Sequence, residues 1–314
     1  MNLSRRLRRL FKNPLVLKDG LSRVRSWRAP LVVAVYLTLQ GLFAVLIVAA
    51  QLATRRHGWG YAQLGSTAFS ALVVVQLALV CLFAPALAAG AISGERERQT
   101  FDVLLVSRVS AFGIVWGKLV ASLAYLILLI LTALPLFAAV FLFGGIDFEQ
   151  FVVTQLVTVS TAITIGAVSV FLSSAFRRTL PSTVAAYGCA FAGLVGTLLV
   201  GSMLSILIAE RQVSADVHPL EFTNPLYALY IVLSSNGAGM HLGRLLQLLV
   251  LAPGGPNSAG PSLEPWQGTL LAQLAIIALS VYGAVRLVGG HRAPQPRPRT
   301  GDETEGVVPE EEQA

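Results

Sequence analysis

The side chains that usually catalyse reactions or bind metals are few in this chain, and they are scattered. The two cysteines, Cys81 and Cys189, both lie in long apolar segments, so we interpret them as small core residues. The four histidines lack metal-ligand spacing; they are His57, His218, His241 and His291. We therefore expect no catalytic residue, no cofactor and no bound metal in this chain.

One segment has glycines and a lysine spaced almost as in a phosphate-binding loop. Residues 113–119 read GIVWGKL, with three residues between the glycines where the nucleotide-binding motif has four. Leu119 occupies the position at which that motif uses serine or threonine to bind magnesium. The bulky Val115 and Trp116 would also crowd a cradle of backbone N–H groups. We conclude that this segment is not a nucleotide site.

The composition indicates which solvent surrounds most of the chain. Apolar residues make up 55% of the 314 positions and charged residues 12%, whereas a globular protein is about 25% charged. A water-soluble protein of this length needs more polar surface than this sequence provides. The composition predicts an integral membrane protein. Its net charge of +7 then favours contact with anionic lipid over contact with nucleic acid.

The long apolar stretches predict how often the chain crosses the membrane. A bilayer core needs roughly 20 apolar residues in a helix, and lipid offers the backbone no hydrogen-bond partner. We therefore predict an all-α membrane protein with six transmembrane helices. They lie at about residues 30–53, 68–90, 114–144, 151–175, 181–209 and 268–288. The third is long enough to be tilted, or bent at Pro135.

Away from their ends, these predicted spans carry essentially no ionisable side chain. Ionisable residues at membrane depth are costly and usually mark a functional site. Their absence argues against an intramembrane enzyme, and equally against a proton-coupled pump with a carboxylate relay.

The distribution of lysine and arginine predicts the orientation of the spans. Basic residues cluster before the first span, between the second and third, at Arg177 and Arg178, and after the sixth. With six spans all these segments lie on one side, which the basic bias makes the cytoplasm. Arg55 and Arg56 are the exception. We expect a multi-pass protein of the plasma membrane with both termini in the cytoplasm.

The ends of the chain flank one six-span domain of residues 30–290. Within residues 1–29, Leu3, Leu7, Leu10 and Phe11 share one helical face and arginines occupy the other. This pattern is typical of an amphipathic helix in the inner headgroup layer, although an ordinary basic flank would look similar. Residues 291–314 are rich in proline and acids, so we predict a disordered cytoplasmic tail.

The segment 210–267 is the longest connection, and six spans place it outside the cell. Its apolar stretches at 226–233 and 242–251 are too short to cross a bilayer, so we expect short helices dipping into the outer leaflet. If the pair did cross, the chain would have eight spans.

Small residues form rows on two of the spans. Such rows let helices approach closely, either inside one protomer or between two. The rows are Ala162, Gly166, Ser169 and Ser173 on the fourth span, and Gly193, Thr197, Gly201 and Ser205 on the fifth. We predict helix packing or a dimer face at these positions.

The cytoplasmic loop after the second span has the most informative charge pattern. Residues 91–105 read AISGERERQTFDVLL, with a charged first half and an apolar stripe in the second. Taken as one helix, the segment would pair Glu95 with Arg98 one turn later. It is suited to transmit force from a soluble partner, although a solvated loop that only stays inside the cell would also be charged.

Residues 92–122 resemble the signature of permeases of type 2 ABC exporters. The matching features are Ser93 to Thr100, the apolar block at 104–106, and Gly117 and Lys118 entering the third span. The segments 13–19 and 224–227 are also similar to parts of that family. Arg108 departs from its pattern, because a proline commonly follows the apolar block there.

This resemblance implies a transporter subunit that binds a separate ATPase subunit and a second permease protomer, identical or different. ATP and magnesium would then bind to the ATPase, and the loop after the second span would be the coupling helix. The residues implied to contact the ATPase are Glu95, Arg96, Glu97, Arg98, Thr100, Phe101, Leu104, Leu105, Arg177 and Arg178.

Two other functions remain open on the sequence alone. The chain could be a non-transporting membrane partner or assembly subunit of an ATPase complex, or an unrelated multispan channel or scaffold. No charged residue in the spans indicates a cargo.

Overall fold

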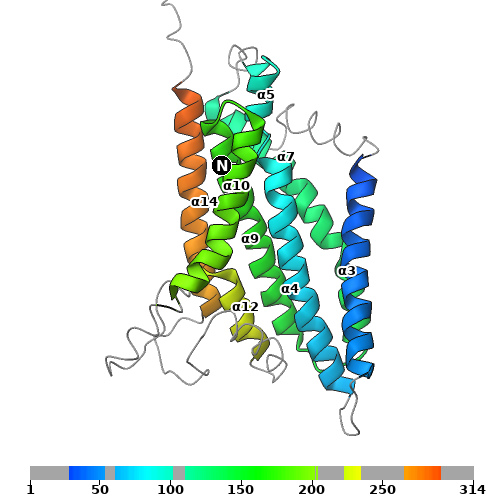
Figure 1. Cartoon of the computed structure of the whole chain (residues 1–314). Coiled ribbons are helices and arrows are strands. Elements are labelled where there is room, and N and C mark those ends of the chain that lie inside the picture. The colour runs from blue at the N-terminus through cyan, green and yellow to red at the C-terminus, as the bar shows by residue number, and fades with distance from the viewer. Residues whose placement is uncertain are drawn as a thin grey trace, which may run out of the picture.

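The structure is a computed structural model, and it describes residues 28–53, 61–101, 110–201, 203, 223–234 and 265–290. Every regular element in these ranges is helical, and six helical segments are long and apolar enough to cross a membrane. They run side by side as a bundle (Figure 1). The predicted amphipathic segment before Arg28 and the tail from residue 291 lie outside the described residues.

The observed helices follow the predicted spans closely. The observed ends differ from the predicted ones by a few residues. The largest difference is at the second span, which begins at Tyr61, seven positions before the predicted start at residue 68. The spans are α3 (Arg28–Ala53), α4 (Tyr61–Ala88), α7 (Ala111–Thr132) with α8 (Leu134–Phe141), α9 (Phe148–Ala175), α10 (Thr179–Phe191) with the π-helical turn η1 (Ala192–Gly196), and α14 (Pro265–Gly289). The predicted end of the fifth span, between 204 and 209, lies outside the described residues.

Two features explain where these helices begin and break. The Ser110 side chain accepts a hydrogen bond from the Gly113 backbone N–H and so caps the start of α7. The third span is interrupted at Ala133, two residues before Pro135, which occupies the first turn of α8. Proline has no N–H and its ring blocks the carbonyl four residues earlier, so the continuous helix ends there.

Between α10 and α14, the structure describes one short helix, α12 (Pro225–Ser234). Ten residues of α-helix span about 15 Å, half of the bilayer core, so α12 over its described length is too short to cross the membrane. Its backbone is tied to α9, because the Gln150 amide donates to the Val232 carbonyl at 2.7 Å. The predicted second short helix, at 242–251, lies outside the described residues.

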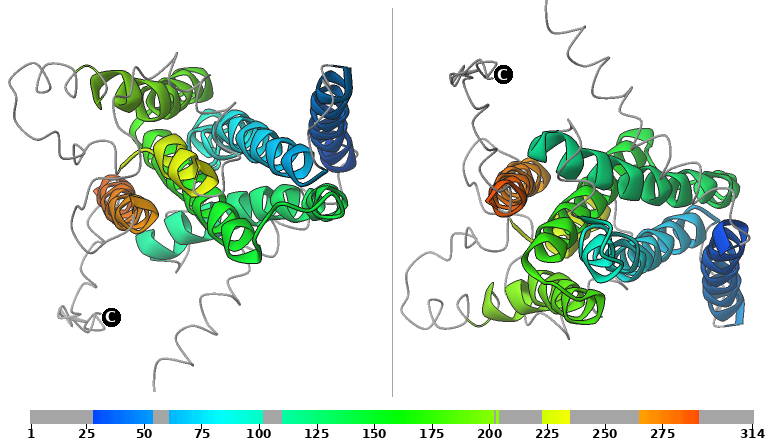
Figure 2. Two further views of the ribbon diagram at one scale, coloured as in Figure 1. Left: turned by 90° about the horizontal axis from the view of Figure 1, so that it is seen from below. Right: turned by 90° about the horizontal axis from the view of Figure 1, so that it is seen from above.

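Helix α9 is the centre of the bundle. It packs against α4, α7, α10, α12 and α14, whereas α3 packs mainly against α4. The views along the bundle show α3 at one edge and α14 at the opposite edge (Figure 2). A helix in the middle of the bundle touches most of the others, so a displacement of α9 affects nearly every span.

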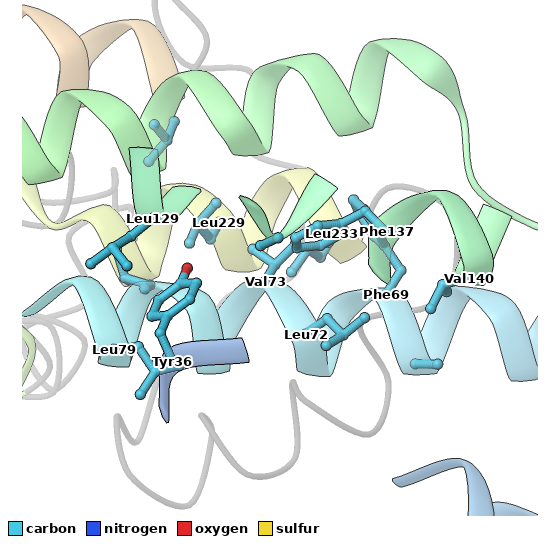
Figure 3. Close-up of a cluster of buried hydrophobic side chains, with 14 of the residues drawn as sticks. Tyr36, Phe69, Leu72, Val73, Leu79, Leu129, Phe137, Val140, Leu229 and Leu233 are labelled. Carbon is cyan, nitrogen blue, oxygen red and sulfur yellow. The ribbon is translucent and has the colours of Figure 1, made fainter. Parts of the chain in front are cut away.

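The largest apolar core lies between α3, α4, α7, α8, α9 and α12. Phe69, Phe137 and Leu229 are fully buried there, and Phe69 and Phe137 make an edge-to-face contact with centroids 5.7 Å apart (Figure 3). Large apolar side chains also cover the outside of the bundle, as in a protein surrounded by lipid. Examples are Leu42 and Val45 of α3.

A neutral polar contact joins two spans inside the bundle. Gln76 of α4 and Gln155 of α9 exchange two amide hydrogen bonds, with nitrogen–oxygen distances of 3.3 and 3.1 Å. Each amide satisfies a donor and an acceptor of the other, which lowers the cost of placing both in an apolar environment.

Candidate functional site

The turn between α4 and α5 (Ser93–Glu97) is held by a serine from a distant part of the chain. The Ser173 hydroxyl oxygen, near the end of α9, accepts hydrogen bonds from the backbone N–H groups of Ile92 and Ser93, both at 2.9 Å. Its own proton is directed to the Ser93 hydroxyl oxygen, 3.2 Å away. Ser173 therefore does for the start of α5 what a capping residue does within one helix.

A second serine binds the same turn from α10. The Ser182 hydroxyl donates to the Ala89 carbonyl at 2.7 Å, and the Ser93 hydroxyl donates to that carbonyl at 3.0 Å. Ser93, Ser173 and Ser182 are all fully buried. The end of α4, the start of α5 and the adjoining ends of α9 and α10 thus form one connected joint, which we call the serine joint (Ala89, Ile92, Ser93, Ser173 and Ser182).

An ion pair connects α5 to the third span. The Lys118 ammonium group of α7 lies 2.9 Å from a carboxylate oxygen of Glu95, and the Thr100 hydroxyl donates to the other oxygen. Lys118 is buried, so its charge is compensated mainly by protein groups and not by water. The sequence pattern predicts that Glu95 pairs with Arg98 on its own helix. The pairing is with α7 instead, which joins two spans.

Helix α5 is shorter than predicted. It ends at Glu97, because Gln99 adopts a left-handed conformation with φ of 58° and two backbone bonds close the end. The Thr100 N–H donates to the Glu95 carbonyl at 2.9 Å and the Gln99 N–H to the Arg96 carbonyl at 3.1 Å, as in a Schellman motif. The prediction of one helix through residue 105 is therefore wrong. Glycine usually marks such an end, and glutamine gave no signal.

The chain folds back into the core immediately after this turn. Phe101 is 5% exposed and packs in an apolar cluster with Ile92 of the α4–α5 turn and with residues of α4, α7, α9 and α14, among them Val115, Val170 and Val288. Its ring faces the interior and attaches the end of the α5 loop to the apolar cluster. The Arg96 guanidinium group lies over it, with the Cζ atom 4.8 Å from the ring centroid.

The remaining predicted contact residues lie on or near the surface. Arg98, Thr100, Arg177 and Arg178 are exposed. Glu97 is also exposed, and one of its carboxylate oxygens accepts a hydrogen bond from the Thr179 hydroxyl of α10 at 2.6 Å. Leu104 and Leu105 lie outside the described residues. The structure therefore gathers the predicted residues of α5 and of the α9–α10 junction at one end of the bundle (Figure 1).

The two rows of small residues occupy different environments. Those of α9 face the interior of the protomer, where a side chain at Gly166 would meet the Leu123 side chain at 3.0 Å. The row on the fifth span is more open, since Gly193 is exposed and a Cβ atom added there would meet nothing within 4 Å. Thr197 accepts a hydrogen bond from the Asn224 amide at 2.6 Å. Gly201 is buried, and Ser205 lies outside the described residues.

The contacts at this end of the bundle connect structural elements to one another. Hydroxyls, one ion pair and an apolar cluster connect a short polar loop to α4, α7, α9, α10 and α14. Among the described residues, no three histidine, cysteine or acidic side chains are placed to hold a metal ion. A family model for ABC-2 family transporter proteins matches residues 14–288.

The chain belongs to this ABC-2 transporter family. Members of the family are membrane components of ABC transporters, which in general act with an ABC ATPase and are generally not catalytic themselves. No curated protein matches the chain.

Several residues of the site in this ABC-2 family chain are not predictable from the sequence pattern. Ser173 was noted only as a member of a small-residue row, and Ser182 and Thr179 were not singled out. Lys118 is part of the rejected phosphate-loop segment and of the family signature, but the sequence pattern assigns it no ion-pair partner. The signal in the sequence is a polar or charged side chain within or next to an apolar stretch. That signal does not identify the partner, which lies 80 positions away for Ser173 and 23 for Lys118.

Proposed function

We propose that this chain is the permease subunit of an ABC exporter, which moves a substrate across the plasma membrane while a separate ATPase subunit hydrolyses ATP. The observation that carries the proposal is the serine joint together with the Glu95–Lys118 pair. A surface loop that only kept the chain oriented would need neither buried hydrogen bonds to α9 and α10 nor an ion pair to α7.

In this proposal, the ATPase binds the polar surface of α5 and displaces it as ATP binds and is hydrolysed. Because the serine joint ties α5 to α9, and α9 packs against five other helices, α9 would carry the displacement to the spans. Packed helices shift between discrete arrangements as rigid bodies. Arg98 and Thr100 are exposed and suited to touch the ATPase, whereas Glu95, Glu97 and Phe101 position the loop.

The proposal includes a second permease protomer, identical or different. A transport path must be enclosed by protein, which a second protomer would help to do. The open small-residue surface around Gly193 would let a helix of that protomer approach closely. ATP and magnesium would bind on the ATPase subunit.

The first test is association with an ATPase. ABC ATPases of the source genome would be co-expressed one at a time with the tagged chain, which would then be purified in detergent. We expect one ATPase to co-purify, and we expect Glu97→Arg with Arg98→Glu to reduce its recovery. Glu149→Arg is the matched control, since Glu149 is also exposed but lies at the start of α9, at the other end of the bundle. Equal recovery with the loop variant and the control would contradict the proposal.

The second test separates a transporter from a non-transporting membrane partner. The purified complex would be reconstituted into vesicles, and ATP hydrolysis measured while candidate substrates are added. A permease couples hydrolysis to transport, so a transported compound should raise the rate and accumulate on one side of the membrane. Association with an ATPase, without stimulation or transport of any compound tested, would favour the assembly-subunit alternative.

A further inference from the structure

The guanidinium group of Arg96 is held in position but lacks an acceptor. Its contact with the Phe101 ring fixes where it lies. The Nη2 atom is shielded from solvent and makes no hydrogen bond within the part of the chain that the structure describes. A shielded donor on a charged group is costly unless an acceptor satisfies it. The position therefore suits an anionic group that arrives from outside.

A second guanidinium group approaches the same place from another element. The α9–α10 junction lies against α5, because Thr179, two residues after Arg177, donates to the Glu97 carboxylate. Burial lowers the pKa of Arg96, and the positive charge of Arg177 lowers it further. The neighbouring acids are engaged elsewhere: Glu95 pairs with Lys118, and Glu97 accepts from Thr179. Among the described residues, neither arginine has an ion-pair partner.

We propose that Arg96 and Arg177 together bind a carboxylate side chain of the ATPase subunit. A guanidinium group binds a carboxylate through two parallel N–H···O bonds, and a second arginine would compensate the same charge from the other side. The inference rests on the proposed function and deepens it, because it states which chemistry the ATPase must offer at this position.

A lipid phosphate has similar chemistry, but the surroundings favour a protein partner. The exposed residues around Arg96 are Glu97, Arg98, Gln99 and Thr100, all of them polar. A surface in contact with lipid would carry apolar side chains at such positions, as α3 does. This polar surface next to Arg96 therefore favours docking of a soluble subunit over contact with lipid.

The test measures the affinity of the ATPase for the purified chain in a non-ionic, phosphate-free detergent. We expect Arg96→Glu and Arg177→Glu each to weaken binding about tenfold or more, because each would oppose the carboxylate with a like charge. Arg177→Glu changes an exposed side chain, so it tests the proposal with little effect on folding. Arg96→Lys should weaken binding less than Arg96→Glu, because it keeps the charge and loses only the paired geometry.

Arg286→Glu is the matched control. Arg286 lies at the same end of the bundle, is exposed, and lies over an aromatic ring, Tyr282, at 5.2 Å. Unlike Arg96, it donates to that residue's hydroxyl at 2.9 Å. Its charge reversal should leave affinity unchanged. An equal loss with this control would show general attraction to basic residues and would overturn the proposal.

Two further experiments test other acceptors for the arginine side chains. Asp102 lies outside the described residues and is the next acid along the chain after Glu97. If Asp102→Asn weakens binding as much as Arg96→Glu, and adding Arg96→Glu to it has no further effect, the acceptor is Asp102 and the proposal fails. An arginine effect that appears only after phospholipid is added back would assign the site to lipid phosphate and would also overturn the proposal.

The decisive result is rescue by charge exchange. One acid-to-arginine substitution on the ATPase should restore binding to Arg177→Glu and weaken binding to the unchanged chain. If the unchanged chain binds no ATPase at all, the proposed function fails. If it binds one but both arginine reversals are without effect, only this inference fails.

Discussion

At the scale of single residues, the α5 loop depends on side chains that satisfy buried groups of another element. Ser173 accepts two backbone N–H groups at once, and no water can replace it because all three residues are buried. Lys118 similarly depends on Glu95 for its charge. Even a conservative substitution of such a residue should lower the stability of the protein, because the buried partner group is left without a hydrogen bond or counter-charge.

Ser173→Ala should destabilise the protein by about 1–3 kcal/mol, because it leaves two buried N–H donors without an acceptor. The measurement is thermal unfolding in detergent. Ser169→Ala is the control. Ser169 is equally buried on the same helix, but its hydroxyl donates to the Ile165 carbonyl of its own helix. A shift no larger for Ser173→Ala than for Ser169→Ala would show that the serine joint adds little stability.

The Glu95–Lys118 pair should show energetic coupling. Glu95→Gln and Lys118→Gln are each expected to destabilise the protein. The double variant should cost less than the sum by about 1 kcal/mol or more, because the second change removes a group that the first has already left unpaired. Denaturation of the four proteins gives the coupling energy. Arg98→Gln is the control, an exposed charge of the same loop. Strict additivity of the two changes would mean that the pair contributes nothing.

At the scale of elements, α9 shows how a helix rich in hydroxyls remains compatible with the membrane. Thr158 donates to the Thr154 carbonyl and Thr161 to the Val157 carbonyl, each at 2.8 Å. These bonds within the helix satisfy the hydroxyl protons without a partner from another helix. Thr161 also accepts from the Gln273 amide of α14 at 2.9 Å, so one side chain both serves its own helix and fixes a neighbour.

The opposite end of the bundle is determined by close backbone contact between α4 and the α8–α9 turn. A Cβ atom at Gly65 would lie 2.1 Å from the Gly144 carbonyl oxygen. A Cβ atom at Gly145, whose φ is 78°, would lie 2.1 Å from the Ala62 carbonyl oxygen. Only glycine permits this approach, because the obstructing atoms belong to the backbone and cannot rotate away.

Gly65→Ala should therefore destabilise the protein by about 1–3 kcal/mol through overpacking, although alanine is the better helix former. Gly188→Ala is the control, since Gly188 lies in α10 with nothing within 4 Å of the added methyl group. There the helix preference of alanine should keep stability equal or raise it. Thermal unfolding of both variants in the same detergent decides the point, and a neutral Gly65→Ala would argue against the close contact.

At the scale of the whole molecule, the two ends of the bundle differ in charge. The end with α5 and the α9–α10 junction carries Arg96, Arg98, Arg177 and Arg178, whereas the α8–α9 turn and the start of α9 carry Asp147 and Glu149. Membrane proteins keep lysine and arginine on the cytoplasmic side, so this asymmetry predicts the orientation of the entire bundle.

Cysteine labelling in intact cells tests that orientation. In a chain with Cys81→Ala and Cys189→Ala, Arg98→Cys should react with a membrane-impermeant thiol reagent only after the cells are permeabilised. Glu149→Cys should react before permeabilisation, because it lies at the opposite end. The reverse pattern would place α5 outside the cell, where no ATPase could bind it, and would refute the proposed function.

Much of this architecture is predictable from the sequence because the bilayer restricts the backbone so severely. Six apolar segments of sufficient length had to be helices, since lipid satisfies no backbone hydrogen bond, and the observed spans lie close to the predicted ones. The family resemblance of residues 92–122 agrees with the family match over 14–288. Boundaries were less predictable where polar residues continue a helix, as Gln63 and Ser66 do at the start of α4.

The membrane-spanning helices, their approximate positions and the family are thus predictable without coordinates, because they depend on local sequence and on the dimensions of the bilayer. The folded arrangement is needed to show that Glu95 pairs with Lys118, that Ser173 holds the start of α5, and that Phe101 faces inward. Helix packing brings those partners together over long sequence separations, so local sequence patterns do not predict such contacts.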